Sequence, residues 1–188
     1  MFVVRSIGFR NRLFRLCWNV VYYLLFRFTP TFLFSWRNFV LSCFGARLGS
    51  GVKIYPSVKI WAPWNLVIED FSTLAPYVEC YSVDTISIGR CTTVSQYSFL
   101  CTASHNYQNL YKSDDGVMPL LSSPIDIGSY VWITSYVFVG PGVVIGNGVV
   151  ATARSVVVDS VPENSIIGGN PAKLLKVRAA SQILSSIK

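Results

Sequence analysis

The chain has 188 residues, 52% of them hydrophobic and 13% charged, which excludes a disordered chain and allows one domain with a buried core. Its net charge of +7 is uneven, because residues 1–47 contain seven arginines and no acidic residue, while residues 48–188 contain nine basic and nine acidic residues. The five cysteines form no CxxC pair, and the single histidine offers no zinc-ligand cluster. We therefore expect a cytoplasmic protein without a signal peptide, whose reduced thiols are buried as small hydrophobic groups.

Two helices are expected in the basic segment, residues 1–47. Apolar residues follow a helical spacing from Leu13 to Phe28, and Pro30 should end this first helix. A second helix is expected in "FLFSWRNFVLSCFGARLG", with its end near Gly45. The longest uncharged stretch, Leu16 to Phe26, is shorter than the about 20 residues that a membrane-spanning helix needs.

Two interpretations of this basic segment remain open. Its helices can form a cap that packs on the rest of the chain or on a neighbouring subunit. They can also lie at a membrane surface, with arginines at anionic headgroups and with Trp18, Tyr22, Tyr23 and Trp36 at the boundary. Nucleic-acid binding fits poorly, because the arginines are spread among large apolar residues rather than gathered on a polar face.

A six-residue repeat runs through residues 48–178. Aliphatic residues recur at the first position of each hexad from Leu48, with two-residue shifts after Leu66 and Ile86, a gap after Leu100, and a restart at Ile127. The fifth position of each hexad is usually small or β-branched. This period predicts a triangular solenoid of short parallel strands, in which both positions point inward and Gly and Pro turn the corners.

The gap in the repeat, at about residues 101–126, contains the only histidine, His105. A loop extruded from a flat solenoid can wall off a reaction, and a neutral imidazole suits proton removal near neutral pH. Cys101 lies four residues earlier, and a Cys–His pair could act as a covalent nucleophile. Because Cys101 follows the inward-facing Leu100, we expect it to face outward, which disfavours the covalent route.

The hexads, together with "SHNY", "VWITSYVFVGPGVVIGNGVV" and "GGNPAKLLK", resemble the hexapeptide-repeat acyltransferases over about residues 46–178. Within that superfamily, "WAPWNLVIEDFS", "SQYSFLCTASHNY" and the arginine-rich front segment look most like the colanic acid biosynthesis O-acetyltransferases. The resemblance implies an all-β, left-handed parallel β-helix over 48–178, with the helical segment 1–47 before it and a short C-terminal tail or helix, 179–188, after it. It also implies a homotrimer that binds acetyl-CoA between adjacent subunits and uses no metal.

The resemblance assigns roles to individual residues. His105 matches the catalytic base, which takes the proton of a sugar hydroxyl as that hydroxyl attacks the thioester. The positions implied on the acetyl-CoA side are Trp132 at the edge of the site, Ser135 near the thioester, Ala153 along the pantetheine arm, and Lys173 and Lys176 at the phosphates. Two departures affect this side. The segment "TAR" stands where the family often has Gly-Ala-Gly, so Arg154 either adds a phosphate contact or is merely exposed. Val158-Asp159 replaces a Thr-Lys pair, which removes one basic contact.

The acceptor side is less defined. Glu79, Tyr81 and Asp84 in the coil beneath the loop, and Asn106 within it, are polar candidates, although each could be an ordinary outward-facing residue. The resemblance suggests a saccharide of an exopolysaccharide unit as acceptor, either free or as a lipid-linked glycan. An N-acetyltransferase acting on an amino sugar and a non-catalytic scaffold remain alternatives. A γ-type carbonic anhydrase is excluded, because it needs several histidine ligands.

Overall fold

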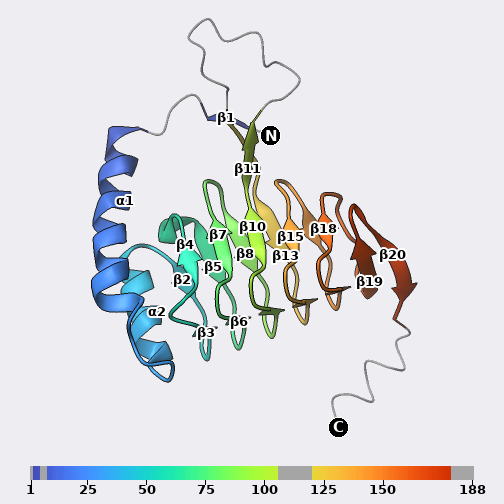
Figure 1. Ribbon diagram of the computed structural model, residues 1–188, viewed down its shortest axis with the longest axis horizontal. Helices are drawn as coiled ribbons and strands as arrows, with labels where there is room; N and C mark the ends of the chain where they lie inside the picture. The colour runs from blue at the N-terminus through green and yellow to red at the C-terminus, as the bar shows by residue number, and fades with distance from the viewer. Residues whose placement is uncertain (1, 5–7, 106–119, 179–188) are drawn as a thin grey trace, which may run out of the picture.

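The computed structural model describes residues 2–4, 8–105 and 120–178. Asn106 and the segment 179–188 therefore lie outside the described residues. The described part forms a parallel β-solenoid with helices at its N-terminal end (Figure 1). Within it, the solenoid has about five coils, and the first three are offset by twenty residues, as the register Lys53↔Thr73↔Thr93 shows.

Each coil contributes one short strand to each of three sides. Side 1 contains β2 (Arg47–Leu48), β5 (Leu66–Ile68), β8 (Ile86–Ile88), β13 (Ile125–Ile127) and β16 (Val144–Ile145). Side 2 contains β3 (Lys53–Ile54), β6 (Thr73–Leu74), β9 (Thr93–Val94), β14 (Trp132–Ile133) and β17 (Val150–Ala151), then β19 (Ser165–Gly169) and the antiparallel β20 (Ala172–Val177). Side 3 contains β4 (Lys59–Ile60), β7 (Glu79–Tyr81), β10 (Phe99–Cys101), β15 (Phe138–Val139) and β18 (Val156–Val157). A 3₁₀ turn, η2 (Pro63–Asn65), follows β4.

The core confirms the six-residue repeat. Every first position of a hexad is buried except Leu48, at the open end, which is partly buried. The fifth positions are buried as well, and several of them are Ser or Thr. Thr92 shows how such a hydroxyl is accommodated, because it donates to the Gly128 carbonyl (2.7 Å) and accepts from the Val131 N–H (3.1 Å) of the next coil. Both inward positions therefore fill the narrow interior without an unpaired hydroxyl at Thr92.

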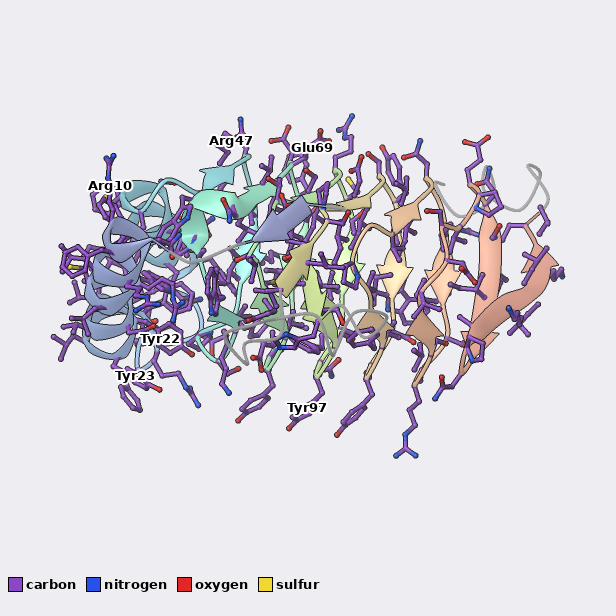
Figure 2. All side chains as sticks on the ribbon, turned by 90° about the horizontal axis from the view of Figure 1, so that it is seen from above. Arg10, Tyr22, Tyr23, Arg47, Glu69 and Tyr97 are labelled. Carbon is purple, nitrogen blue, oxygen red and sulfur yellow. The ribbon has the colours of Figure 1, made fainter. Side chains whose placement is uncertain are left out.

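The corners depart from the expectation that Gly and Pro turn them. Among the described residues, the positive-φ positions other than glycine are Phe71, Tyr77, Cys91, Tyr97, Tyr130, Tyr136, Arg154 and Asn164. Tyr97 (Figure 2) stacks between Tyr77 and Tyr136 at the corner from side 2 to side 3, with ring centroids 4.9 Å apart in both pairs. Stacking of this kind stabilises by about 1 kcal/mol per pair, which offsets part of the cost of a left-handed non-glycine residue.

Both expected helices are confirmed. The first comprises α1 (Phe9–Val21) and a π-helical continuation, η1 (Tyr22–Phe26), and the second is α2 (Phe34–Cys43). Pro30 lies in the turn between them. The end of α2 is fixed by Gly45 at φ 88°, where the Gly45 and Ala46 N–H groups donate to the Ser42 and Leu41 carbonyls in a Schellman motif.

The helices close the free edge of the first coil. In the second coil, the Ser72, Leu74 and Cys80 carbonyls accept N–H groups from the first coil. Because no coil precedes the first one, its equivalent carbonyls have no backbone donors from a preceding coil. Side chains replace the missing donors: Asn38 Nδ2 to Val52 O (2.9 Å), Arg37 Nε to Ile54 O (2.6 Å) and Trp18 Nε1 to Ile60 O (2.7 Å). The basic segment is therefore a cap that satisfies an otherwise open sheet edge.

The side of the first helix that packs on the solenoid is not the predicted apolar stripe. Trp18, Tyr22 and Phe26 are the buried residues of α1 and η1, whereas Leu16 and Leu24 are exposed. The π turn closes over five residues, so residues four apart stay close to one face. The expected membrane-boundary role of Trp18 and Tyr22 is therefore wrong, because both are buried against the first coil.

The cysteines also divide differently from the expectation that all are buried. Cys80 and Cys101 are buried, but Cys17 and Cys43 on the two helices are exposed and Cys91 is intermediate. The helical cysteines lie on sides that the solenoid does not cover, so burial follows the packing of the cap rather than residue type.

Candidate active site

A hairpin interrupts the solenoid where the repeat breaks. After β10, the chain forms β11 (Ala103–His105) and returns through β12 (Leu120–Ser122), before β13 resumes side 1. The two strands are antiparallel with His105 opposite Leu120, and β1 (Phe2–Val4) adds to the other edge of β12. Figure 1 shows this small sheet projecting away from the solenoid, at the corner between sides 3 and 1.

Thr102 fixes the base of this hairpin. It is fully buried, and its N–H (3.2 Å) and hydroxyl (2.8 Å) both donate to the Tyr81 carbonyl. The same hydroxyl accepts the Asp84 N–H (2.9 Å), and the Thr102 carbonyl accepts the Ser123 N–H (2.9 Å). Thr102 thus ties the outgoing strand, the returning strand and the coil beneath them together. Sequence analysis missed this role, although the position of Thr102 in the "TASH" stretch was a usable signal.

Asp84 braces the returning strand from the coil beneath. Its Oδ1 accepts the Thr85 N–H (2.7 Å), and its Oδ2 accepts the Ser122 hydroxyl (3.2 Å). Ser122 lies opposite Ala103 in the hairpin register, and Ala103 comes two residues before His105 in the same strand. The Asp84 carboxylate therefore holds β12, the strand that pairs with the histidine-bearing strand β11. Its acceptor-binding role stays a prediction.

His105 ends the described part of the outgoing strand. Its side chain is exposed, as is that of Ser104, whereas Ala103 is buried at the hairpin base. The imidazole therefore lies outside the solenoid core, on a hairpin strand whose base is held by hydrogen bonds to the coil beneath it. Asn106, the predicted acceptor contact next to it, lies outside the described residues.

Glu79 and Tyr81 lie on the outer surface of side 3. Glu79 is exposed, with Oε2 3.9 Å from Lys59 Nζ, and the Tyr81 ring meets the Trp61 ring edge to face at 5.5 Å. A cavity of about 300 Å³ separates the first helix from this side of the solenoid. Its polar lining residues are Asn19, Tyr22, Tyr23, Arg27, Lys59 and Glu79. Trp18, Ile60, Trp61 and Cys80 complete the lining, so Glu79 faces a mixed polar and apolar hollow of a size that suits a small ligand.

The candidates for the acetyl-CoA side lie elsewhere on the chain. Trp132 on side 2 is half-exposed and donates its indole N–H to Ser95 Oγ (3.0 Å), and Ser135 lies at the corner from side 2 to side 3. Ala153 and Arg154 occupy the same corner one coil later, where the Arg154 guanidinium is 5.9 Å from the Tyr136 ring centroid.

Lys173 and Lys176 belong to β20, at the opposite end of the solenoid from the helices, and both are exposed. One chain therefore places the hairpin and the acetyl-CoA candidates at different corners. The structure brings Tyr81 and Asp84 to the hairpin base, but it does not bring Trp132 or Ser135 to that corner.

Cys101 is buried, although it stands in register with Tyr81 on the outer surface of side 3, so the expected outward orientation does not expose the thiol. The Cys101 thiol donates to the Ala103 carbonyl (3.0 Å) at the hairpin base. Burial raises the pKa of this thiol above its ordinary value, and the nearby Glu79 charge adds to the effect. The neutral thiol is a poor nucleophile, which argues against covalent transfer through Cys101.

The fold is shared with solved acetyltransferases. A maltose O-acetyltransferase from Clostridium difficile 630 matches with a TM-score of 0.81 and 24% identity, over 92% of this chain and 90% of that one. A hexapeptide-repeat acetyltransferase of Vibrio cholerae, solved with acetyl coenzyme A, matches with a TM-score of 0.78 and 22% identity, over 90% of each chain. The expected left-handed β-helix is confirmed by this likeness.

The sequence comparison is more specific. The chain is 38% identical over 165 residues to the putative colanic acid biosynthesis acetyltransferase WcaF of Escherichia coli K12, covering 88% of this chain and 87% of that protein. No protein-family model matches the chain. At this identity and coverage, the chain belongs to the hexapeptide-repeat acetyltransferase family.

Proposed function

We propose that this protein transfers an acetyl group from acetyl-CoA to a sugar hydroxyl during the synthesis of a surface polysaccharide. The observation that carries the proposal is the braced hairpin, which presents His105 outside the core of an acetyltransferase fold. The name of the Escherichia coli relative concerns colanic acid, which supports a saccharide or lipid-linked glycan as acceptor. The proposed location is the cytoplasm.

In the proposed reaction, the neutral imidazole of His105 takes the proton of the acceptor hydroxyl as its oxygen attacks the thioester carbonyl. A new C–O bond forms, and the carbonyl oxygen becomes an oxyanion, which the Ser135 hydroxyl or a backbone N–H would stabilise. The C–S bond then breaks, and the departing CoA sulfur takes the proton from His105. No acyl-enzyme forms, so Cys101 has no role in the transfer.

We further propose that the active unit is a homotrimer. His105 and the group formed by Trp132, Ser135 and Ala153 lie at different corners of one solenoid, so a neighbouring subunit is needed to bring such groups together. Each site would then take the hairpin of one subunit and the side 2 to side 3 corner of the next, with Arg154, Lys173 and Lys176 towards the CoA phosphates. Glu79, Tyr81, Asp84 and Asn106 remain the proposed acceptor contacts, and residues 48–178 remain the proposed catalytic domain.

The test combines His105→Ala with labelled acetyl-CoA and a panel of sugars, amino sugars and lipid-linked glycans. We expect the substitution to leave the mass of the assembly and the affinity for acetyl-CoA unchanged, because His105 lies outside the core. It should lower transfer to a hydroxyl by about two to four orders of magnitude, which is the usual contribution of a positioned base. Cys101→Ala serves as the matched control and should keep most of the activity.

Three outcomes would oppose the proposal. A loss of only a few-fold in His105→Ala with a hydroxyl acceptor removes the base assignment. An acetyl group on Cys101, seen by intact-mass analysis with acetyl-CoA alone and discharged by sugar at the turnover rate, establishes the covalent route instead. Transfer to amino sugars alone shows an N-acetyltransferase, which depends less on base assistance.

A further inference from the structure

The side of the first helix that faces away from the solenoid is apolar along its whole length. This outer apolar face comprises Phe9, Leu13, Leu16, Val20 and Leu24, which recur every three or four residues on the helix, and the exposed Phe28 and Phe32 follow in the turn after it. Their exposed fractions range from 49% to 82%, although Trp18, Tyr22 and Phe26 on the opposite side are buried. Single exposed apolar residues are ordinary, but a continuous row of them marks an interaction surface.

The charges beside this outer apolar face have one sign. Arg10 and Arg12 are exposed on the same helix, and Arg27 is partly exposed at its end. Residues 1–47 contain no acidic residue, so these charges have no counter-charge on the cap. A second copy of the chain docked through the same face would bring arginines together without an acid to neutralise them, which is unfavourable. Anionic lipid headgroups would supply the missing charge.

The position of the helix suits a flat partner. Figure 1 shows α1 standing at the N-terminal end of the solenoid, so its outer side is directed away from the sheets and the hairpin. Among the described residues, no helix is long and apolar enough to cross a membrane. A helix with one apolar side and flanking arginines binds in the plane of the bilayer surface instead.

We propose that the outer apolar face binds the surface of a bilayer that contains anionic lipid. Phe9, Leu16 and Leu24 enter the boundary between headgroups and acyl chains, while Arg10 and Arg12 lie at the headgroup phosphates. The surface is separate from the proposed catalytic residues, so this inference stands independently of the proposed acetyl transfer. It also gives the cap a second role besides closing the first coil.

Vesicle co-sedimentation of the full chain tests the proposal, with phosphatidylcholine vesicles that either contain or lack phosphatidylglycerol. Binding should require phosphatidylglycerol and weaken as salt is added. Arg10→Gln/Arg12→Gln should weaken it by about thirty-fold, from about 1 kcal/mol for each basic residue near an anionic surface. Arg90→Gln, an exposed arginine on the solenoid, is the matched control and should not change binding.

A second pair of variants tests the apolar contact. Leu16→Gln/Leu24→Gln should lower binding by tenfold or more, whereas Leu174→Gln/Leu175→Gln, at comparably exposed positions on β20, should leave it unchanged. Unaltered circular dichroism shows that the helices persist. Failure of the wild-type chain to bind, or equal binding by Leu16→Gln/Leu24→Gln, overturns the proposal. If that pair instead lowers the mass of the assembly in solution without changing lipid binding, the face is an interface between copies.

Discussion

Replacing Thr102 with valine should loosen the hairpin while leaving the shape of the core intact. Valine has nearly the volume of threonine, so the buried site is refilled without a cavity. The substitution removes the hydroxyl that donates to the Tyr81 carbonyl and accepts the Asp84 N–H. The Tyr81 carbonyl keeps the Thr102 backbone N–H, but the Asp84 N–H loses this partner.

The size of the effect follows from these two bonds. A lost intramolecular hydrogen bond costs about 1 kcal/mol, and a buried donor left unsatisfied costs about 1–3 kcal/mol, so we expect a loss of about 2 kcal/mol in the free energy of unfolding. For a chain of this size, that corresponds to a fall of about 4–8 °C in Tm. Because the lost bonds hold the hairpin base, the rate of acetyl transfer should fall as well, by at least tenfold if His105 shifts by about 1 Å.

Thr92→Val is the matched control for this experiment. The Thr92 hydroxyl makes the same two kinds of bond between coils, and it is equally buried, but it lies at the corner from side 1 to side 2. Both variants should lose similar stability in thermal unfolding, but only Thr102→Val should lose activity and show faster amide hydrogen exchange in β11 and β12. Equal activity in the two variants would refute the reasoning that Thr102 positions the histidine-bearing strand.

Two further predictions concern buried groups. Arg37→Met should lower the free energy of unfolding by about 3 kcal/mol in urea titrations, since it leaves the Ile54, Pro30 and Thr31 carbonyls without their charged donor, while exposed Arg90→Met should stay within about 0.5 kcal/mol of wild type. Iodoacetamide near neutral pH should label Cys17 and Cys43 but not Cys80 in peptide mass spectra, because burial raises the pKa of Cys80 to about 12. Since the unfolded thiol ionises near pH 9.0, this group should lower stability as the pH rises from there towards 12, and labelling of folded Cys80 near neutral pH would contradict its burial.

The solenoid could be predicted from the sequence because the six-residue period of the sequence matches the length of one side of the coil. A hexad places its first and fifth residues inward on every side, so Ile54, Leu74 and Val94 could be assigned to the core one by one. The tyrosine corners could not be predicted, because steric preference favours glycine there. The stacking that offsets this preference joins Tyr97 to Tyr77 and Tyr136, twenty and thirty-nine residues away in the chain.

The orientation of the first helix could not be predicted, because apolar residues occur on both of its sides. The orientation is set by Trp18, whose indole N–H donates to the Ile60 carbonyl at the open edge of the first coil, forty-two residues away.

In the candidate site, the position of His105 was predictable from the broken repeat. The bracing by Asp84 was not, because its partner Ser122 is thirty-eight residues distant and lies beyond the interruption.

The regular stacking of parallel coils sets the distance between the capping helix and the hairpin along the solenoid axis. Neighbouring strands are spaced by about 4.8 Å, and the hairpin leaves the third coil, so His105 stands about 10 Å beyond the level of the first coil. The capping helix adds about another 10 Å, the width of a helix with its side chains. If the outer apolar face binds a bilayer and His105 acts on a lipid-linked acceptor, as proposed above, the reacting hydroxyl would lie on the order of 20 Å above the lipid, within the first few sugars of that acceptor. Adding or removing a whole coil between β4 and β10 would move that height in steps of one strand spacing, and with it the sugar that can be reached.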